Sequence, residues 1–166
     1  MILIGLGANL PSGEFGPPAK TLEAAMAAME ARAITVAARS PLYESAPVPV
    51  SDQPWFFNRV IRVETALDPR PLLDVLLEIE RRFGRRRGAA NAPRVLDLDL
   101  LAYDAVITGP DACPVLPHPR MHSRAFVLLP LAEIAPHWRH PGDGTPLALL
   151  IARLPGGQTA RPCPPS

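Results

Sequence analysis

Two aspartates separated by one residue carry the strongest chemical signal in the sequence. Asp97 and Asp99 lie within the segment LDLDL. Alternate side chains of a β-strand share a face, so the two carboxylates would project together while Leu100 faces the core. Mg²⁺ binds one or two carboxylates and completes its shell with water and substrate phosphates. The spacing favours a magnesium–nucleotide site, although two solvated aspartates on an exposed strand would have the same spacing.

Arginines gather next to this pair. They make up five of the seven residues from 81 to 87, and Arg94 lies just before the aspartates. A guanidinium can bind phosphate through two parallel hydrogen bonds, which suits a polyphosphate. The first two of the five fit a solvated helix surface, so we expect Arg85, Arg87 and Arg94 to be the functional ones.

A third cluster lies in LPHPRMHSRAF at 116–126. His118 is flanked by two prolines, which hold it in an extended loop where its ring can reach a ligand. We expect His118 and Arg124 to bind a ligand and His122 to be structural. Lys20 is the only lysine of the chain, which excludes phosphate-loop and protein-kinase chemistry because both place a lysine on the phosphates.

Apolar periodicity predicts the elements that position these residues. The order strand, helix, strand, strand, helix, strand indicates an α+β, ferredoxin-like fold, a mostly antiparallel sheet with helices packed on it. We expect a single domain over residues 1–158 and a loose tail over 159–166. Strands are predicted over 2–6, 34–43, 57–66 and 95–103, and helices over 19–33, 69–83, 125–135 and 147–154, with proline-rich loops at 45–54 and 110–119.

Composition narrows the classes of function. The chain has 166 residues, a net charge of +1 and 22 prolines. A general nucleic-acid binder needs a surplus of positive charge, which is absent. The two cysteines have neither metal-ligand spacing nor disulfide density, and no apolar run approaches the length of a membrane span. We therefore expect a cytoplasmic protein that binds neither nucleic acid nor membrane. Separately, we expect a monomer.

Four segments together resemble one enzyme family. GLGANL (5–10), SPLYESAPV (40–48), APRVLDLDLLAYD (92–104) and PHPRMHSRAFVLLPLAEIAP (117–136) are similar to 6-hydroxymethyl-7,8-dihydropterin pyrophosphokinases of folate biosynthesis. The similarity covers nearly the whole chain in the right order. It implies a ferredoxin-like fold and transfer of the pyrophosphoryl group of ATP to the pterin hydroxymethyl group, with release of AMP.

The resemblance also implies roles for individual residues. Two Mg²⁺ ions would bridge the ATP phosphates, and a mobile arginine loop would close over the reaction and exclude water. Asp97 and Asp99 would hold the two metals. Arg85 and Arg87 would act from the closing loop. Arg94, His118 and Arg124 would bind the triphosphate, and Glu80 and Leu100 would belong to the nucleotide site. Phe56 and Phe126 would sandwich the pterin, Asn58 would hydrogen-bond it, and Ser45, Pro47 and Val48 would line its pocket.

The closing loop departs from the family pattern. Asn91 stands where many members carry tryptophan. An amide cannot stack on a pterin as an indole does, so we expect weaker pterin retention, which Asn91→Trp should restore.

Three other readings are compatible with parts of the sequence. A degenerate family member would bind pterin or nucleotide without turnover. A palm-like nucleotidyl transferase also places carboxylates on a ferredoxin-like sheet for two-metal chemistry. Such an enzyme would need a basic groove for its template, and the chain has no surplus of basic residues. An RNA-binding module of similar topology would need stacking aromatics on its central strands, which VIRVETA and VLDLDLL lack.

Overall fold

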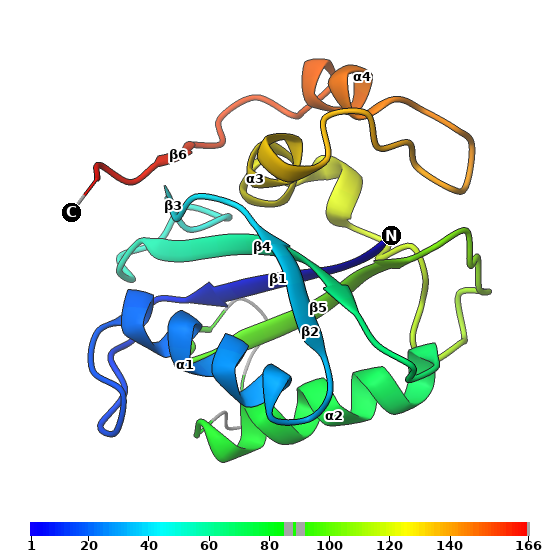
Figure 1. Cartoon of the computed structure of the whole chain (residues 1–166). Coiled ribbons are helices and arrows are strands. Elements are labelled where there is room, and N and C mark those ends of the chain that lie inside the picture. The colour runs from blue at the N-terminus through cyan, green and yellow to red at the C-terminus, as the bar shows by residue number, and fades with distance from the viewer. Residues whose placement is uncertain (85–87, 89–91, 166) are drawn as a thin grey trace.

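The computed structural model describes residues 1–84, 88 and 92–165. The expected functional residues Arg85 and Arg87, and Asn91, lie outside the described residues. Helices cover both faces of an antiparallel sheet (Figure 1). The described strands are β1 (Ile2–Ala8), β2 (Thr35–Arg39), β3 (Tyr43–Ser45), β4 (Phe56–Glu64), β5 (Asp97–Tyr103) and β6 (Ala160–Pro162), and the helices are α1 (Pro18–Glu30), α2 (Pro69–Arg82), η1 (Met121–Ser123, a 3-10 turn), α3 (Ala125–Ile134) and α4 (Leu147–Ala152).

The strand order confirms the ferredoxin-like fold. The sheet runs β5-β1-β4-β3-β6, with β2 also paired to β4, and every pair is antiparallel. β2 and β3 both pair with β4, so together they occupy one position in the sheet, and β3 carries β6 on its other side. This is the arrangement in which two strand–helix–strand units interleave.

The segment that forms β2 and β3 is interrupted, whereas the sequence predicts a continuous strand over 34–43. β2 pairs with β4 from Ile61 onward and β3 pairs with its first three residues. Pro41 lies in the gap and has no amide hydrogen to donate to a neighbouring strand. Ser40 fills the break, because its hydroxyl accepts a hydrogen bond from the Val60 amide (3.1 Å).

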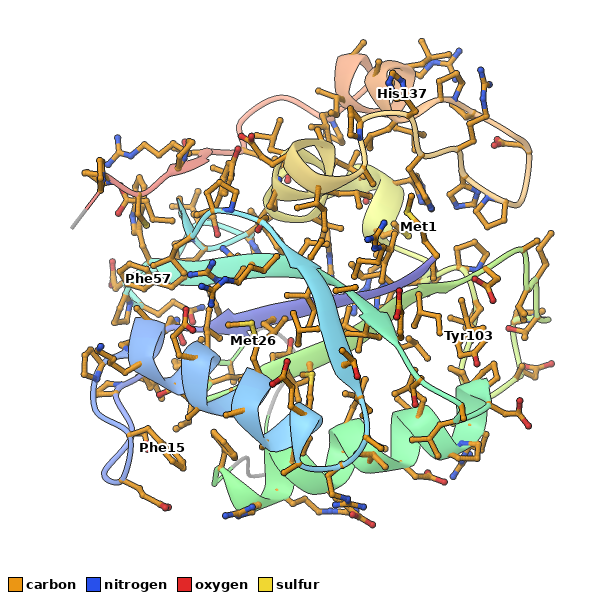
Figure 2. The ribbon with its side chains drawn as sticks, viewed as in Figure 1. Met1, Phe15, Met26, Phe57, Tyr103 and His137 are labelled. Carbon is orange, nitrogen blue, oxygen red and sulfur yellow. The ribbon has the colours of Figure 1, made fainter. Side chains whose placement is uncertain are left out.

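Two apolar cores lie on opposite faces of the sheet. Ile4 and its alternate neighbours on β1 pack with α1 and α2, and Met26 points from α1 toward the sheet (Figure 2). Leu3, on the other face of β1, packs with α3 and α4. α1 and α2 lie below the sheet in Figure 1, and α3 and α4 lie above it. The first residues of β1 therefore have apolar side chains on both faces of the sheet.

The helix boundaries follow backbone chemistry. α2 begins at Pro69, where a missing amide hydrogen costs nothing, and Asp68 occupies the N-cap position without a side-chain capping bond. Gly84 follows the helix with φ of 93°, a conformation that favours glycine. α1 ends at Glu30, earlier than the predicted 33, because Ala33 already has φ of 59°.

The C-terminal segment corrects one prediction. The sequence predicts a loose tail from residue 159, yet Ala160–Pro162 form β6 against β3. The Cys163 amide donates to the carbonyl of Leu42 (2.8 Å), which extends the pairing. The prolines of this segment had argued against a strand. An edge strand tolerates proline, however, because alternate amides of such a strand have no partner in the sheet. Separately, no helix within the described part of the chain is both long enough and apolar enough to cross a bilayer.

Candidate active site

Two glycines of β1 form the floor of the site. The register pairs Gly5 with Asp99 and Gly7 with Asp97 on one side, and Gly7 with Asn58 on the other. Residues directly opposite each other in antiparallel strands share a face. Both carboxylates and the amide therefore project from the face that carries α3, across a strip of β1 that has no side chains.

A cavity of about 790 Å³ lies above this floor. Its walls come from the loop after β3, from the start of α3 and from the segment after α4. Most of the expected site residues line it, namely Ser45, Pro47, Val48, Phe56, Asn58, Arg94, Asp97, Asp99, Arg124 and Phe126. Among the other residues that line it, Gly5, Gly7, Gln53 and the segment 155–158 had been given no role from the sequence.

Arginines neutralise the two carboxylates. Arg94 Nη1 lies 2.8 Å from Asp97 Oδ1, and Arg124 Nη1 lies 3.7 Å from Asp99 Oδ2. Burial lowers the pKa of Arg124, whereas the nearby Asp99 carboxylate raises the pKa of Arg124. The carboxylate therefore offsets part of the effect of desolvation on the guanidinium. The aspartates can share a strand face because each has a cation within reach. Phosphate oxygens would meet the same two guanidinium groups.

His118 does not line the cavity, but it lies beside the carboxylate pair as a neutral hydrogen-bond donor. Burial is the largest of the causes that lower its pKa to about 4; Arg124 and Arg120 also lower the pKa, and Asp97 raises it by less. Its Nδ1 accepts a hydrogen bond from the Arg120 amide (3.2 Å), so the proton of the neutral ring lies on Nε2. Nε2 lies 4.0 Å from Asp99 Oδ1. The ring thus presents an N–H group to the carboxylate pair.

Glu80 and Leu100 lie beneath the floor and do not line the cavity. Glu80 is 1% exposed, and its Oε1 accepts a hydrogen bond from the Leu98 amide (2.7 Å), between the two aspartates of β5. Leu100 is buried in the core on the α1 and α2 face. Only the backbone of Leu100 could therefore contact a nucleotide. Glu80 holds β5, the strand that carries Asp97 and Asp99, through its hydrogen bond to the Leu98 amide.

A buried amide and two aromatic rings line the other end of the cavity. Asn58 is buried, and its Nδ2 donates to Ser45 Oγ (2.7 Å). Phe56 and Phe126 are half-buried and both line the cavity, and the Arg124 guanidinium lies 5.4 Å from the centre of the Phe126 ring. Phe57, by contrast, packs against the core under the sheet. A flat, polar heterocycle fits such a surface of rings and amides.

Asn9 joins the two ends of the cavity, and the sequence reasoning did not name it. Its Oδ1 accepts a hydrogen bond from the Arg94 amide (2.8 Å). Its Nδ2 donates to Gln53 Oε1 (2.9 Å) and to the carbonyl of Pro54 (3.0 Å). The side chain is 2% exposed. Its place after the glycines of GLGANL was the available signal, because a polar residue that follows a buried strand needs buried partners.

The donor set fits magnesium bound together with a phosphate ligand. Among the described residues, no three His, Cys, Asp or Glu side chains gather closely enough to hold a metal by themselves. Asp97 and Asp99 supply two carboxylates on one face. Mg²⁺ takes one or two protein carboxylates and fills its other positions with water and substrate phosphates. The arrangement is thus typical of a metal that arrives with a polyphosphate.

Comparison with known proteins identifies the family. A family model described as 7,8-dihydro-6-hydroxymethylpterin-pyrophosphokinase (HPPK) matches residues 3–136. Two proteins named 2-amino-4-hydroxy-6-hydroxymethyldihydropteridine pyrophosphokinase are similar over most of both chains. The one from Methylorubrum extorquens is 43% identical over 134 residues, 80% of this chain and 81% of that protein. The one from Pseudomonas aeruginosa is 41% identical over 155 residues, 93% of this chain and 91% of that protein.

Longer proteins match as well. The mitochondrial folate synthesis bifunctional protein of Arabidopsis thaliana is 38% identical over 154 residues, and the match spans 27% of its length. The crystal structure of wild-type Plasmodium falciparum HPPK-DHPS with SDX-DHP superposes with a TM-score of 0.67 at 15% identity, covering 92% of this chain and 43% of that one. At that identity the superposition shows a shared fold.

Proposed function

The chain belongs to the 7,8-dihydro-6-hydroxymethylpterin-pyrophosphokinase family, and from that premise we propose how its cavity divides between two substrates. The enzyme transfers pyrophosphate from ATP to the hydroxymethyl group of 6-hydroxymethyl-7,8-dihydropterin in folate biosynthesis. The reacting groups must therefore meet over the glycine floor, with the triphosphate toward β5 and the pterin toward β4.

Asp97, Asp99 and the cations beside them make up the triphosphate end. The two carboxylates would hold two Mg²⁺ ions, which when bound supply neutralisation of the charge on the phosphate oxygens. Arg94 and Arg124 donate to those oxygens through their guanidinium groups, and His118 donates through Nε2–H. The distances of 2.8 and 3.7 Å from these arginines to the aspartates support a shared ligand. Arg85 and Arg87 are proposed to add charge from the closing loop.

The pterin end is built by β4, the loop after β3 and the start of α3. Phe56 and Phe126 stack on the two faces of the ring, Asn58 hydrogen-bonds its edge, and the segment from Ser45 to Val48 forms the wall. The hydroxyl oxygen of the pterin attacks the β-phosphorus, and the hydroxyl proton is released to water as the new P–O bond forms. The bond from that phosphorus to the oxygen of the α-phosphate breaks, so AMP leaves.

One observation carries this division. The register places Asp97 and Asn58 on opposite sides of Gly7 on one face of the sheet, so a ligand on Asn58 reaches the metal site without an intervening side chain. The expected monomeric state stays a prediction. A cytoplasmic location and the lack of nucleic-acid binding stay predictions.

AMP formation from ATP, Mg²⁺ and 6-hydroxymethyl-7,8-dihydropterin tests the proposal. Asp97→Ala and Asp99→Ala should each lower kcat by at least about 100-fold, because each removes a carboxylate that holds the charge-stabilising metal. Asp111→Ala is the matched control, since Asp111 is exposed and away from the cavity. Native rates in both cavity variants would refute the metal site. Pterin binding without AMP formation by the unmodified protein would favour the degenerate, binding-only reading.

A further inference from the structure

The segment after α4 forms one wall of the cavity. Pro155, Gly156, Gly157 and Gln158 line it, and all four lie beyond residues 3–136 that match the family model. The segment therefore contributes to the site from a part of the chain that the family model does not cover.

Gln158 spans the start of α3 with both ends of its amide. Its Oε1 accepts a hydrogen bond from the Ala125 amide (2.9 Å), and its Nε2 donates to the carbonyl of Ser123 (2.9 Å). These two backbone groups flank Arg124. Nε2 also donates to the carbonyl of Pro155 (3.3 Å), which ties the side chain to its own loop.

The start of α3 lacks a cap of its own. Arg124 occupies the N-cap position in an extended conformation (φ −112°, ψ 114°) and makes no side-chain capping bond. An arginine side chain has no acceptor, so it cannot satisfy the free amides of the first turn. Gln158 Oε1 supplies that acceptor from outside the helix.

The same segment also holds the opposite wall of the cavity. The Thr159 carbonyl accepts a hydrogen bond from the Ala46 amide (3.0 Å), and Ala160 pairs with Ser45 in the β3–β6 ladder. Residues 158–160 therefore connect the wall before Pro47 to the backbone on both sides of Arg124. The spacing between the two walls depends on this connection.

We propose that Gln158 is a positioning residue that fixes Arg124 and Phe126 relative to the aspartates and the pterin wall. The inference rests on the proposed roles of those two residues. An amide is suited to the task because it donates to one backbone group and accepts from the other at once. Without it, the Arg124 guanidinium and the Phe126 ring would leave the geometry in which they meet their ligands, and a displacement of about 1 Å can cost about 100-fold in rate.

Gln158→Met tests the proposal, because methionine has a similar length and neither the donor nor the acceptor that the contact needs. The KM for MgATP should rise about tenfold, since the loss of preorganisation weakens triphosphate binding. Exchange of the Ala125 amide hydrogen with solvent should become about tenfold faster in the protein without substrates. Thr159→Val is the matched control, because the Thr159 side chain is exposed and its carbonyl bond is kept.

A double-mutant cycle with Arg124→Met separates positioning from general stability. If Gln158 acts through Arg124, the effects of Gln158→Met and Arg124→Met on the KM for MgATP should be strongly non-additive. Additive effects, or a native KM in Gln158→Met, would overturn the positioning role. Unchanged exchange at Ala125 would overturn the contact itself, whatever the activity. A native KM in Arg124→Met alone would refute the proposed triphosphate site instead, so the two failures are distinguishable.

Discussion

Gly7→Ala should separate substrate binding from stability. Gly7 lies opposite Asn58 in β4, and its φ is not in the left-handed region, so alanine fits the backbone. A Cβ at this position would lie 3.3 Å from Asn58 Oδ1. Contacts between 3.4 and 4 Å are ordinary, so the amide must move by a few tenths of an ångström. The buried Asn58 has little room to move, because Ser45 already holds its Nδ2 at 2.7 Å.

Two opposing terms set the size of the effect. Overpacking a tight site costs about 1–3 kcal/mol. Replacing glycine by alanine where the backbone allows it stabilises by about 0.4–1 kcal/mol through the unfolded chain. The two terms nearly cancel at the lower end, so the melting temperature should change little. The displaced Asn58 amide and the new methyl group on the cavity floor should both weaken the binding of the pterin. A loss of about 1.4 kcal/mol in binding free energy corresponds to about tenfold weaker pterin binding.

Calorimetric titration with the pterin, in the presence of magnesium and a non-hydrolysable ATP analogue, measures this loss directly. Gly13→Ala is the matched control, because a Cβ at Gly13 meets nothing within 4 Å and the position lies outside the cavity. Gly13→Ala should leave the pterin Kd unchanged. If Gly7→Ala binds pterin as tightly as the native protein does, the glycine floor is not part of the pterin site.

Three further predictions concern residues around the site. Glu80→Leu should lower the free energy of unfolding in urea by at least about 2 kcal/mol, since it leaves the buried Leu98 amide without its acceptor, and Glu80→Gln should lower it less. Asn58→Leu should raise the KM for the pterin at least about tenfold and leave the KM for MgATP unchanged, because only the pterin end loses a hydrogen-bonding group. Burial and the hydrogen bond to Glu133 (2.8 Å) raise the pKa of Tyr43 to about 12. The unfolded chain releases that proton near pH 10, so stability should fall as the pH rises from 10 to 12, and melting curves of Tyr43→Phe should lack this part of the fall.

Regular elements with a clear period could be predicted from the sequence. The apolar stripe of α2, bounded by Pro69 and Gly84, fixes a helix whose ends need no tertiary contact. β6 could not be found in the same way. It has three residues, and its pairing with β3 depends on a neighbour more than 100 residues away in sequence. Local patterns carry no information about such a partner.

Within the candidate site, too, features that depend on local sequence could be predicted, whereas features that depend on distant partners could not. Alternation within β5 is enough to place Asp97 and Asp99 on one face. The floor depends instead on the register of β1 with both neighbours, and a glycine in a strand does not reveal whether it leaves space for a ligand or for another backbone. Gln158 shows the same limit, because its role depends on the start of α3, more than 30 residues earlier.

The partial exposure of the ion pairs matters for how the site accepts a ligand. Arg94 and Asp97 are paired at 2.8 Å with side chains that are 27% and 25% exposed. A fully buried pair would cost about 3–5 kcal/mol to break, whereas a pair in contact with water is worth about 0–1 kcal/mol. Arg94 can therefore exchange its carboxylate for a phosphate oxygen at small cost, provided that Asp97 receives a cation in return. Arg124 and Asp99, 3.7 Å apart, are related in the same way. At the proposed triphosphate site, each arginine would thus keep an anionic partner and each aspartate a cationic one before and after substrate binds. Local pairing of this kind would let a chain with a net charge of +1 hold a triphosphate.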